Sequence, residues 1–213
     1  MVRIAEITRK TNETNIVLRL NLDGTGVALL EYPIGFMAHM LNAFAKHGLF
    51  DIELRAQGDL EVDQHHLVED TGITLGQAFT QALGERRGIC RVGSCLYPMD
   101  ETLARAACDL SGRGFLVFDT GISGIPLVSA GADGTSRPFQ TDTIADFWQG
   151  FASACGCSLH LDILRGRSDH HKIEALFKAA ARALRAACQI DSRNPSQIPS
   201  TKGTLDAQGI MIC

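Results

Sequence analysis

The chain has 213 residues, of which 45% are hydrophobic and 21% are charged, and its formal net charge is −4. This is the composition of an ordinary globular protein with enough apolar residues for a sizeable core. The negative charge and the lack of any basic run argue against a nucleic-acid partner. The sequence contains no apolar run of about 18 residues, the length that a membrane span needs, and no signal segment is evident. We therefore expect a soluble, cytoplasmic protein without a membrane partner.

The first half of the chain predicts a hairpin, a helix, two short strands and a second helix. The hairpin strands are expected over 3–10 and 15–22, because polar turn residues separate them and the second one alternates. Apolar residues at helical spacing predict a helix over 36–47. Strands are predicted over 50–56 and 60–62. The next helix begins near residue 65 and ends at Leu83, just before Gly84.

The second half shows a similar order. A strand is predicted over 89–97, a short helix over 99–107 and an interrupted strand over 108–119. Residues 119–138 are rich in Gly, Ser and Asp and predict a loop. A helix over 142–155, a strand over 158–164 and a helix ending near Cys188 follow. The tail from Arg193 is predicted to be an extended arm.

The two halves therefore predict an internal duplication. His39 precedes one His-His pair by 26 residues, and Asp146 precedes the other by 24. A duplicated strand-helix-strand-helix unit packs about a pseudo-twofold axis, which gives an α/β fold, a layered α+β sandwich. We expect a single domain over 1–192, made of repeats at about 1–88 and 89–192, and a C-terminal arm over 193–213.

A repeated cluster of potential metal ligands begins the last predicted helix of each half. The clusters are His65, His66 and Glu69, and then His170, His171 and Glu174. The first His and the Glu lie on one helix face and can chelate one metal, whereas the second His points roughly 100° away. A single helical histidine is more often structural, but two such clusters favour a first-row divalent metal.

The pseudo-twofold predicts two six-coordinate metal sites. One would take His39, His65, Glu69 and His171, and the other Asp146, His170, Glu174 and His66. Whether the halves meet within one chain or between subunits stays open at this point, and in the second case metal binding would drive assembly. His160 is interpreted as a buried structural histidine, with a place beside the second site as the alternative.

Together these motifs resemble imidazoleglycerol-phosphate dehydratase, a family of histidine-biosynthesis enzymes, over nearly the full chain. The resemblance is carried by residues 10–14, 36–41, 58–59, 65–70, 98–101, 109–113, 170–178 and 200–203. It implies a lyase of the hydro-lyase class, with two Mn²⁺ ions per active site and sites shared between subunits. It also implies a homo-oligomer in which trimers assemble into a 24-subunit shell.

The resemblance further implies a small-molecule phosphate substrate, imidazole glycerol phosphate, which is dehydrated to imidazole acetol phosphate. Metal ions on the ring nitrogens would stabilise the imidazolate-like electron pair that forms. Glu13, otherwise interpreted as a solvated turn carboxylate, would be the catalytic acid/base. The substrate-binding positions would be His47, Arg91, Arg113, Lys178, Ser200, Thr201 and Lys202.

Three positions depart from the family's pattern. Ala38 stands where the family has Asp, Asp146 where it has a ligand His, and Ser168 where it has Asn. Asp146 can still bind manganese through oxygen, whereas Ala38 removes a partner that orients a ligand. Three hypotheses follow: a working dehydratase, a diverged paralogue with an altered substrate, and a non-catalytic, metal-dependent assembly.

Overall fold

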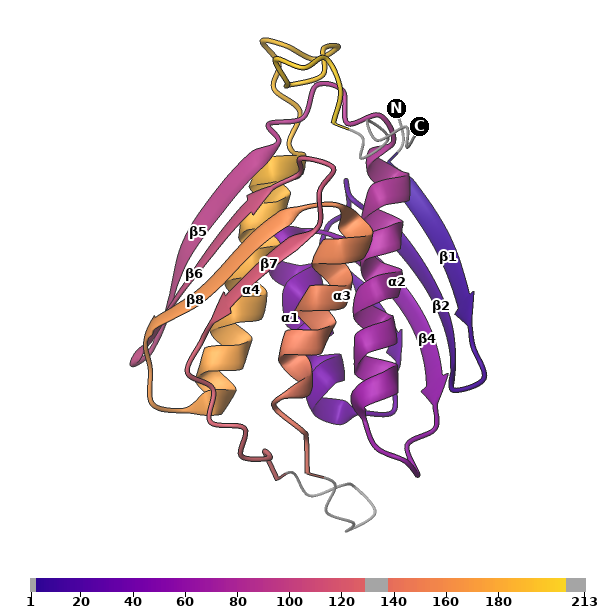
Figure 1. Cartoon of the computed structure of the whole chain (residues 1–213), viewed down its shortest axis with the longest axis vertical. Helices are drawn as coiled ribbons and strands as arrows, with labels where there is room; N and C mark the ends of the chain where they lie inside the picture. Colours follow the sequence, from indigo (N-terminus) through magenta and orange to yellow (C-terminus); the bar gives the residue numbers. More distant parts are fainter. Residues whose placement is uncertain (1–2, 129–137, 206–213) are drawn as a thin grey trace, which may run out of the picture.

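Two β-sheets enclose four helices in the computed structural model of the chain (Figure 1). The structure describes residues 3–128 and 138–205. Part of the predicted central loop (129–137) and the end of the predicted C-terminal arm (206–213) therefore lie outside the described residues. No helix in the described segments is long and apolar enough to cross a membrane.

The helices and strands of the two halves follow one another in the same order. The first half consists of β1 (Ile4–Lys10), β2 (Thr14–Asn21), β3 (Ala28–Glu31), α1 (Gly35–Gly48), β4 (Asp51–Gly58) and α2 (His65–Leu83). The second half consists of β5 (Val92–Met99), β6 (Thr102–Asp109), β7 (Phe115–Asp119), α3 (Thr143–Cys155), β8 (Ser158–Arg165) and α4 (Asp169–Cys188).

The sheet topology confirms the predicted internal duplication and the layered α/β fold. The strand orders are β1-β2-β4-β3 and β5-β6-β8-β7. In each sheet the third strand in sequence pairs in parallel with its neighbour, and the other pairings are antiparallel. The repeated unit is therefore β-β-β-α-β-α, which has two more strands than the predicted strand-helix-strand-helix repeat.

Each sheet buries one face against the helices and leaves the other exposed. In β2, Ile16, Leu18 and Leu20 are fully buried, while the alternate residues Val17 and Arg19 face solvent. This alternation is what places successive side chains on opposite faces of a strand. The helices supply the other half of the core, because α4 buries an apolar stripe that includes Ile173 and Leu176.

Three sequence predictions were wrong in detail. The helix predicted over 99–107 is mostly strand β6, whose residues alternate between buried and less buried positions. Its alanines favour a helix locally, but pairing with β5 and β8 decides the structure. The segment predicted as a strand over 60–62 is a turn, in which the N–H of Val62 donates a hydrogen bond to the carbonyl of Asp59. Strand β3 was not predicted at all.

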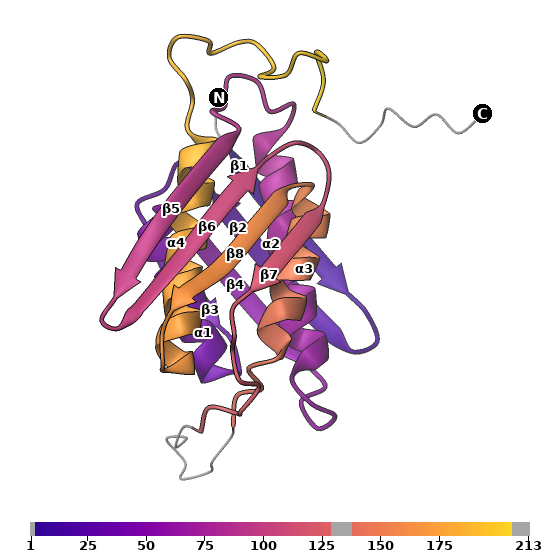
Figure 2. The ribbon, with the colours of Figure 1, turned by 60° about the vertical axis from the view of Figure 1, so that its left-hand side comes forward.

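The helices pack across the two halves of the chain. Helix α2 lies along α3, and α1 lies along α4. Figure 2 shows α3 and α4 behind the sheet of the second half, while α2 belongs with the first sheet. The approach of α2 to α3 is close, because a Cβ on Gly72 would lie 2.1 Å from the carbonyl oxygen of Phe147.

We expect the substitution Gly72→Ala to lower the free energy of unfolding by roughly 1–3 kcal/mol, since the added methyl group forces α2 away from the α3 backbone. The measurement is urea unfolding of the metal-free protein. Gly35→Ala on α1 is the matched control, because a Cβ there meets nothing within 4 Å. Equal stability of the two variants would contradict this account of the α2–α3 contact.

Candidate metal and substrate site

The first ligand cluster joins α1 to the beginning of α4. One ligand atom from each of His39, His170 and Glu174 lies within 4.8 Å of the others. The Glu174 carboxylate oxygen Oε2 is 3.5 Å from Nε2 of His39 and 3.2 Å from Nε2 of His170. Both imidazoles are about half-exposed, whereas Glu174 is buried. Two imidazoles and a carboxylate are a donor set that suits a first-row divalent metal.

The second ligand cluster is the duplicated counterpart of the first, at the beginning of α2. Nε2 of His65 lies 3.6 Å from Glu69, and Nδ1 of the same ring lies 3.5 Å from Oδ2 of Asp146. Asp146 sits in the first turn of α3. The carboxylate of Asp146 therefore reaches His65, the first histidine of the pair on α2.

This geometry corrects the predicted division of the ligands. His39 lies with His170 and Glu174 rather than with His65, and Asp146 lies with His65 and Glu69 rather than with His170. The reason is the packing of helices across the halves, since α1 contacts α4 and α3 contacts α2. Each first helix of a half therefore supplies its ligand to the His-His helix of the other half.

The second histidine of each pair is held by a carboxylate through Nδ1. His66 Nδ1 lies 3.1 Å from Asp59 and 3.9 Å from Glu13, and His171 Nδ1 lies 2.8 Å from Glu101. The hydrogen bond with Asp59 raises the pKa of His66, and that with Glu101 raises the pKa of His171. The sequence predicted that each of these rings joins the ligand cluster of the other half, and within one chain neither ring does so.

Glu13 stands in the turn between β1 and β2, next to His66. Its backbone N–H and that of Thr14 donate to Oγ1 of Thr11, at 3.1 and 2.9 Å. Thr14 Oγ1 in turn donates to Asp70 on α2, at 2.5 Å. The turn is therefore fixed to the metal-ligand helix. The Glu13 side chain is 53% exposed and accepts no hydrogen bond from the described residues.

Lys178 and His47 lie farther along α4 and α1. Lys178 Nζ is 2.7 Å from Oε1 of Glu174 and stands over the ring of Tyr97. The rings of His47 and Tyr97 pack edge to face, with centroids 5.4 Å apart. Burial, and then the positive charges of Lys178 and Arg182, lower the pKa of His47. Lys178 therefore places a positive charge beside the ligand cluster of His39, His170 and Glu174, and the rings of Tyr97 and His47 lie next to it.

The other predicted substrate-binding residues lie at the far end of the helices. Arg91 forms a two-pronged ion pair with Asp109 and donates to the carbonyl of Pro199, which precedes Ser200, Thr201 and Lys202. Its backbone N–H donates to Ala187, near the end of α4, while His170 and His171 begin that helix. At 1.5 Å per residue, the two ends are roughly 25 Å apart.

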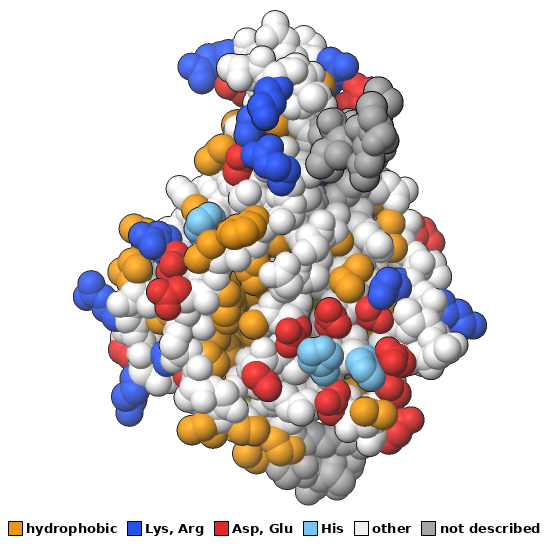
Figure 3. Space-filling model, in the orientation of Figure 1, with side chains coloured by type: hydrophobic (Ala, Val, Ile, Leu, Met, Phe, Trp, Pro, Cys, Tyr) orange, Lys and Arg blue, Asp and Glu red, His pale blue; other side chains and the backbone are white. Residues whose placement is uncertain are grey.

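The far end also holds Arg113. It follows Gly112, whose N–H donates to Gly156 at the end of α3. In the space-filling view, one group of acidic and histidine side chains lies on the lower part of the visible face, and one group of Lys and Arg side chains lies at the top, with others along both sides (Figure 3). Within one chain, Lys178 therefore lies beside a ligand cluster, whereas Arg91, Arg113 and residues 200–202 lie at the other end of the helices.

Three other residues singled out in the sequence have clear positions. Ser168 caps α4, with its Oγ accepting from the His171 N–H at 3.4 Å. Ala38 is half-buried on α1. His160 is exposed on β8, in register with Ala107, so the interpretation as a buried histidine was wrong.

Asp59 and Glu101 were not predicted as site residues, although both touch a site histidine. A signal for Glu101 was present, because the pair Glu13-Thr14 at the first hairpin turn recurs as Glu101-Thr102 at the second. Asp59 has no such counterpart in the sequence.

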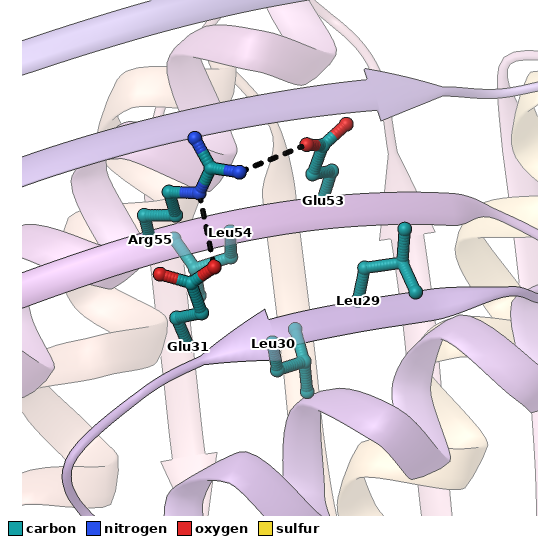
Figure 4. Close-up of a pocket in the computed structure, with 6 residues that line it drawn as sticks. All are labelled: Leu29, Leu30, Glu31, Glu53, Leu54 and Arg55. Carbon is teal, nitrogen blue, oxygen red and sulfur yellow. Dashed lines mark hydrogen bonds and ion pairs between the residues drawn. The ribbon is translucent and has the colours of Figure 1, made fainter.

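A separate pocket lies on the first sheet, away from these residues (Figure 4). It is lined by Leu29, Leu30, Glu31, Glu53, Leu54 and Arg55. Arg55 pairs with Glu31 at 3.2 Å and with Glu53 at 4.0 Å across it. None of the candidate ligands or phosphate residues takes part in it.

Comparisons with known proteins agree on one family. The family model for imidazoleglycerol-phosphate dehydratase matches residues 33–184. A protein of that name from Acinetobacter baumannii (strain AYE) is 51% identical over 203 residues, which cover 95% of this chain and 96% of the relative. One from Methylorubrum populi is 48% identical over 204 residues, covering 96% of this chain and all of the relative.

Solved structures give the same result. The crystal structure of imidazoleglycerol-phosphate dehydratase from Staphylococcus aureus N315 is similar with a TM-score of 0.72 and 31% identity, over 88% of this chain and 99% of that one. The enzyme from Pyrococcus furiosus, in complex with (S)-C348, gives a TM-score of 0.74 and 30% identity, over 93% of this chain and 100% of that one.

We expect Glu174→Gln to lower the free energy of unfolding of the metal-free protein by roughly 2 kcal/mol at neutral pH. This is less than the ~3–5 kcal/mol typical when one partner of a fully buried pair is removed, since Lys178 and Glu174 keep some contact with solvent. The matched control is Glu69→Gln, whose carboxylate is 43% exposed and should cost little.

The loss in free energy of unfolding caused by Glu174→Gln should depend on pH. Burial opposes ionisation of Glu174, but the hydrogen bond and charge of Lys178, with a contribution from His39, outweigh it and lower the pKa. A carboxyl group with a lower pKa in the folded state than in the unfolded state stabilises the fold at pH values above its unfolded-state pKa. This contribution disappears as the pH falls through the folded-state pKa. The difference between wild type and Glu174→Gln, measured by urea unfolding, should therefore shrink below about pH 4. A constant difference would contradict the ion pair.

Proposed function

The chain belongs to the imidazoleglycerol-phosphate dehydratase family and is therefore a hydro-lyase, and we propose that it dehydrates imidazole glycerol phosphate in histidine biosynthesis. The product would be imidazole acetol phosphate. The observation that carries this proposal is the pair of duplicated imidazole–carboxylate clusters, with the exposed carboxylate of Glu13 near His66 beside one of them. Such an arrangement suits a substrate with an imidazole ring and a carbon-bound proton to be removed.

Two Mn²⁺ ions per active site fit the residues present. His39, His170 and Glu174 would hold one ion, and His65, Glu69 and Asp146 would hold the other. Nε2 of His66 and of His171 is left for a further bond, because Nδ1 of each ring faces a carboxylate. When bound, such ions would act as Lewis acids toward the nitrogens of the substrate ring.

Glu13 is the acid/base in this proposal. A general base needs a carboxylate that is accessible to the substrate, and the Glu13 side chain is 53% exposed, with Nδ1 of His66 3.9 Å away. It would accept the proton of the second carbon from the ring, the one that becomes the carbonyl carbon of the product. The hydroxyl group on the ring-bound carbon leaves as water by taking up that proton from Glu13, and the enol that remains becomes the ketone. The link from Thr14 to Asp70 keeps this turn at a fixed distance from α2.

A second copy of the chain is needed to complete the site. The substrate carries its ring and its phosphate a few bonds apart, whereas the ligand clusters and Arg91 lie at opposite ends of α4. The far end supplies cations with the planar geometry that suits phosphate: Arg91 and Arg113, with Ser200, Thr201 and Lys202 beside them. We therefore infer a homo-oligomer, in keeping with the 24-subunit shell implied above, in which this end of one subunit meets the ligand clusters of another.

The direct test mixes manganese-loaded protein with imidazole glycerol phosphate and follows formation of the ketone. Growth of a histidine auxotroph that carries this chain would show the same activity in a cell. Bound manganese without turnover, together with failure to support growth, would reject the proposed reaction and favour a non-catalytic assembly.

Replacing Glu13 by Gln should lower turnover by about 10²- to 10⁴-fold, the usual contribution of a general acid/base, while manganese affinity stays close to wild type. Steady-state kinetics and calorimetric titration with Mn²⁺ measure the two effects. Glu6→Gln, an exposed carboxylate on β1, serves as the control. Equal loss of metal binding and of turnover would argue against a role in proton transfer.

Mixing two inactive variants tests the shared site. Glu13→Gln removes the acid/base at one end of the chain, and Arg91→Ala removes a phosphate cation at the other. If one site uses both ends from different subunits, oligomers assembled from the mixture contain intact sites and regain activity. Each variant assembled alone should stay inactive, and a mixture that also stays inactive would contradict the shared site.

A further inference from the structure

Two carboxylates outside the proposed ligand set contact the second histidine of each pair. Glu101, in the turn between β5 and β6, accepts from His171 Nδ1 at 2.8 Å. Asp59, just after β4, faces His66 Nδ1 with both oxygens, at 3.2 and 3.1 Å. Neither carboxylate belongs to the ligand clusters described above. Their equivalent placement in two halves of a duplicated chain suggests a shared purpose.

We propose that Glu101 and Asp59 are positioning residues for the metal centre, which fix the rings of His171 and His66 with Nε2 directed at the ion. This inference rests on the proposed function, because it needs metal to be bound there. A carboxylate on one ring nitrogen keeps the proton on that nitrogen, so the other is left as the ligand atom. Metal-ligating histidines generally have such a partner.

Glu101 is itself held rigidly, as a positioning residue must be. Its Oε1 accepts the backbone N–H groups of Ser168 at 3.0 Å and of Arg167 at 3.3 Å, which leaves Oε2 for His171. Ser168 also caps α4 by accepting from the His171 N–H. The hairpin turn, the loop before α4 and the first turn of α4 therefore form one hydrogen-bonded unit around the ring.

Asp59 is anchored differently but to the same effect. Its backbone N–H donates to the carbonyl of Glu13 at 3.1 Å, so it is tied to the neighbouring hairpin turn. Its side chain is only 20% exposed, compared with 53% for Glu13. Asp59, rather than Glu13, is therefore the carboxylate in position to hold His66.

Comparison of the two halves explains why different residues do this. The duplicated turns both carry a glutamate, Glu13 and Glu101, but only Glu101 bonds its histidine. The segment between β4 and α2 is longer than that between β8 and α4, and it contains Asp59, whereas residues 166–168 contain no carboxylate. In the first half, Asp59 in this longer segment bonds His66, which leaves Glu13 for proton transfer.

The test uses Glu101→Gln, Glu101→Ala and Asp59→Asn, with Glu31→Gln as the control. Glu31 is a surface carboxylate at the pocket in Figure 4, and its ion pair there is with Arg55. The measurements are calorimetric titration with Mn²⁺ and thermal unfolding of the metal-free protein. We expect manganese affinity to fall about 10- to 100-fold in Glu101→Ala, and by less in Glu101→Gln and Asp59→Asn, since each of these amides keeps one acceptor oxygen.

A purely structural role predicts a different result. It would lower the unfolding temperature of the metal-free variants and leave manganese affinity unchanged in those that fold. The positioning role predicts lost affinity with little change in that temperature relative to Glu31→Gln. Should Glu101→Ala fail to fold, the isosteric variants Glu101→Gln and Asp59→Asn decide the question.

The same experiment separates this inference from the proposed function. If wild type binds manganese and both isosteric variants bind it equally well, the positioning role is overturned while the proposed function stands. If wild type itself binds no manganese, the proposed metal centre fails and the positioning role fails with it. If the isosteric variants keep both wild-type manganese affinity and turnover, the positioning role is likewise overturned and the proposed function stands.

Discussion

The packing of each helix of one half against a helix of the other half is the contact on which the rest of the structure depends. It places α1 along α4 and α3 along α2, so the ligands of two distant sequence segments meet. The contact is close enough for glycine alone at Gly72 and Gly76, where a Cβ would lie 2.1 and 2.5 Å from backbone oxygens of α3. A helix shifted outward by a side chain there would carry His65 away from Asp146.

The two ends of the helices differ in charge and in chemistry. The beginnings of α2 and α4 gather imidazoles and carboxylates, whereas the far end gathers Arg91, Arg113 and the arm that contains Lys202. These two ends are too far apart for one small substrate to reach both within one chain. This separation is the physical basis for the homo-oligomer we propose.

The duplication also shows where the halves have diverged. Thr14 Oγ1 donates to Asp70, which also pairs with Arg9, so the turn that carries Glu13 is clamped to α2. In the second half, Ala175 stands at the position of Asp70, and Thr102 Oγ1 is buried without a hydrogen-bond partner among the described residues. There the turn is held through Glu101 instead. The N–H of Ser168 and the ring of His171 stabilise its ionised form and lower its pKa to about 2. A carboxylate so firmly ionised is a poor proton acceptor, which fits the division of roles between Glu101 and Glu13.

The sequence by itself determined the local structure and the chemistry. The spacing of apolar residues predicted the four helices of the described residues and most of their strands, and the repeated His-His motif indicated the candidate metal ligands and the family resemblance. Prediction from the sequence failed at the alanine-rich strand β6, because pairing with two neighbouring strands overrides the local helix propensity there. Only the tertiary structure decided which ligands meet, since helix packing across the halves depends on contacts that no spacing along the chain encodes. For the same reason it alone showed Asp59 at His66, and the separation of Arg91 from the histidines that it was expected to accompany.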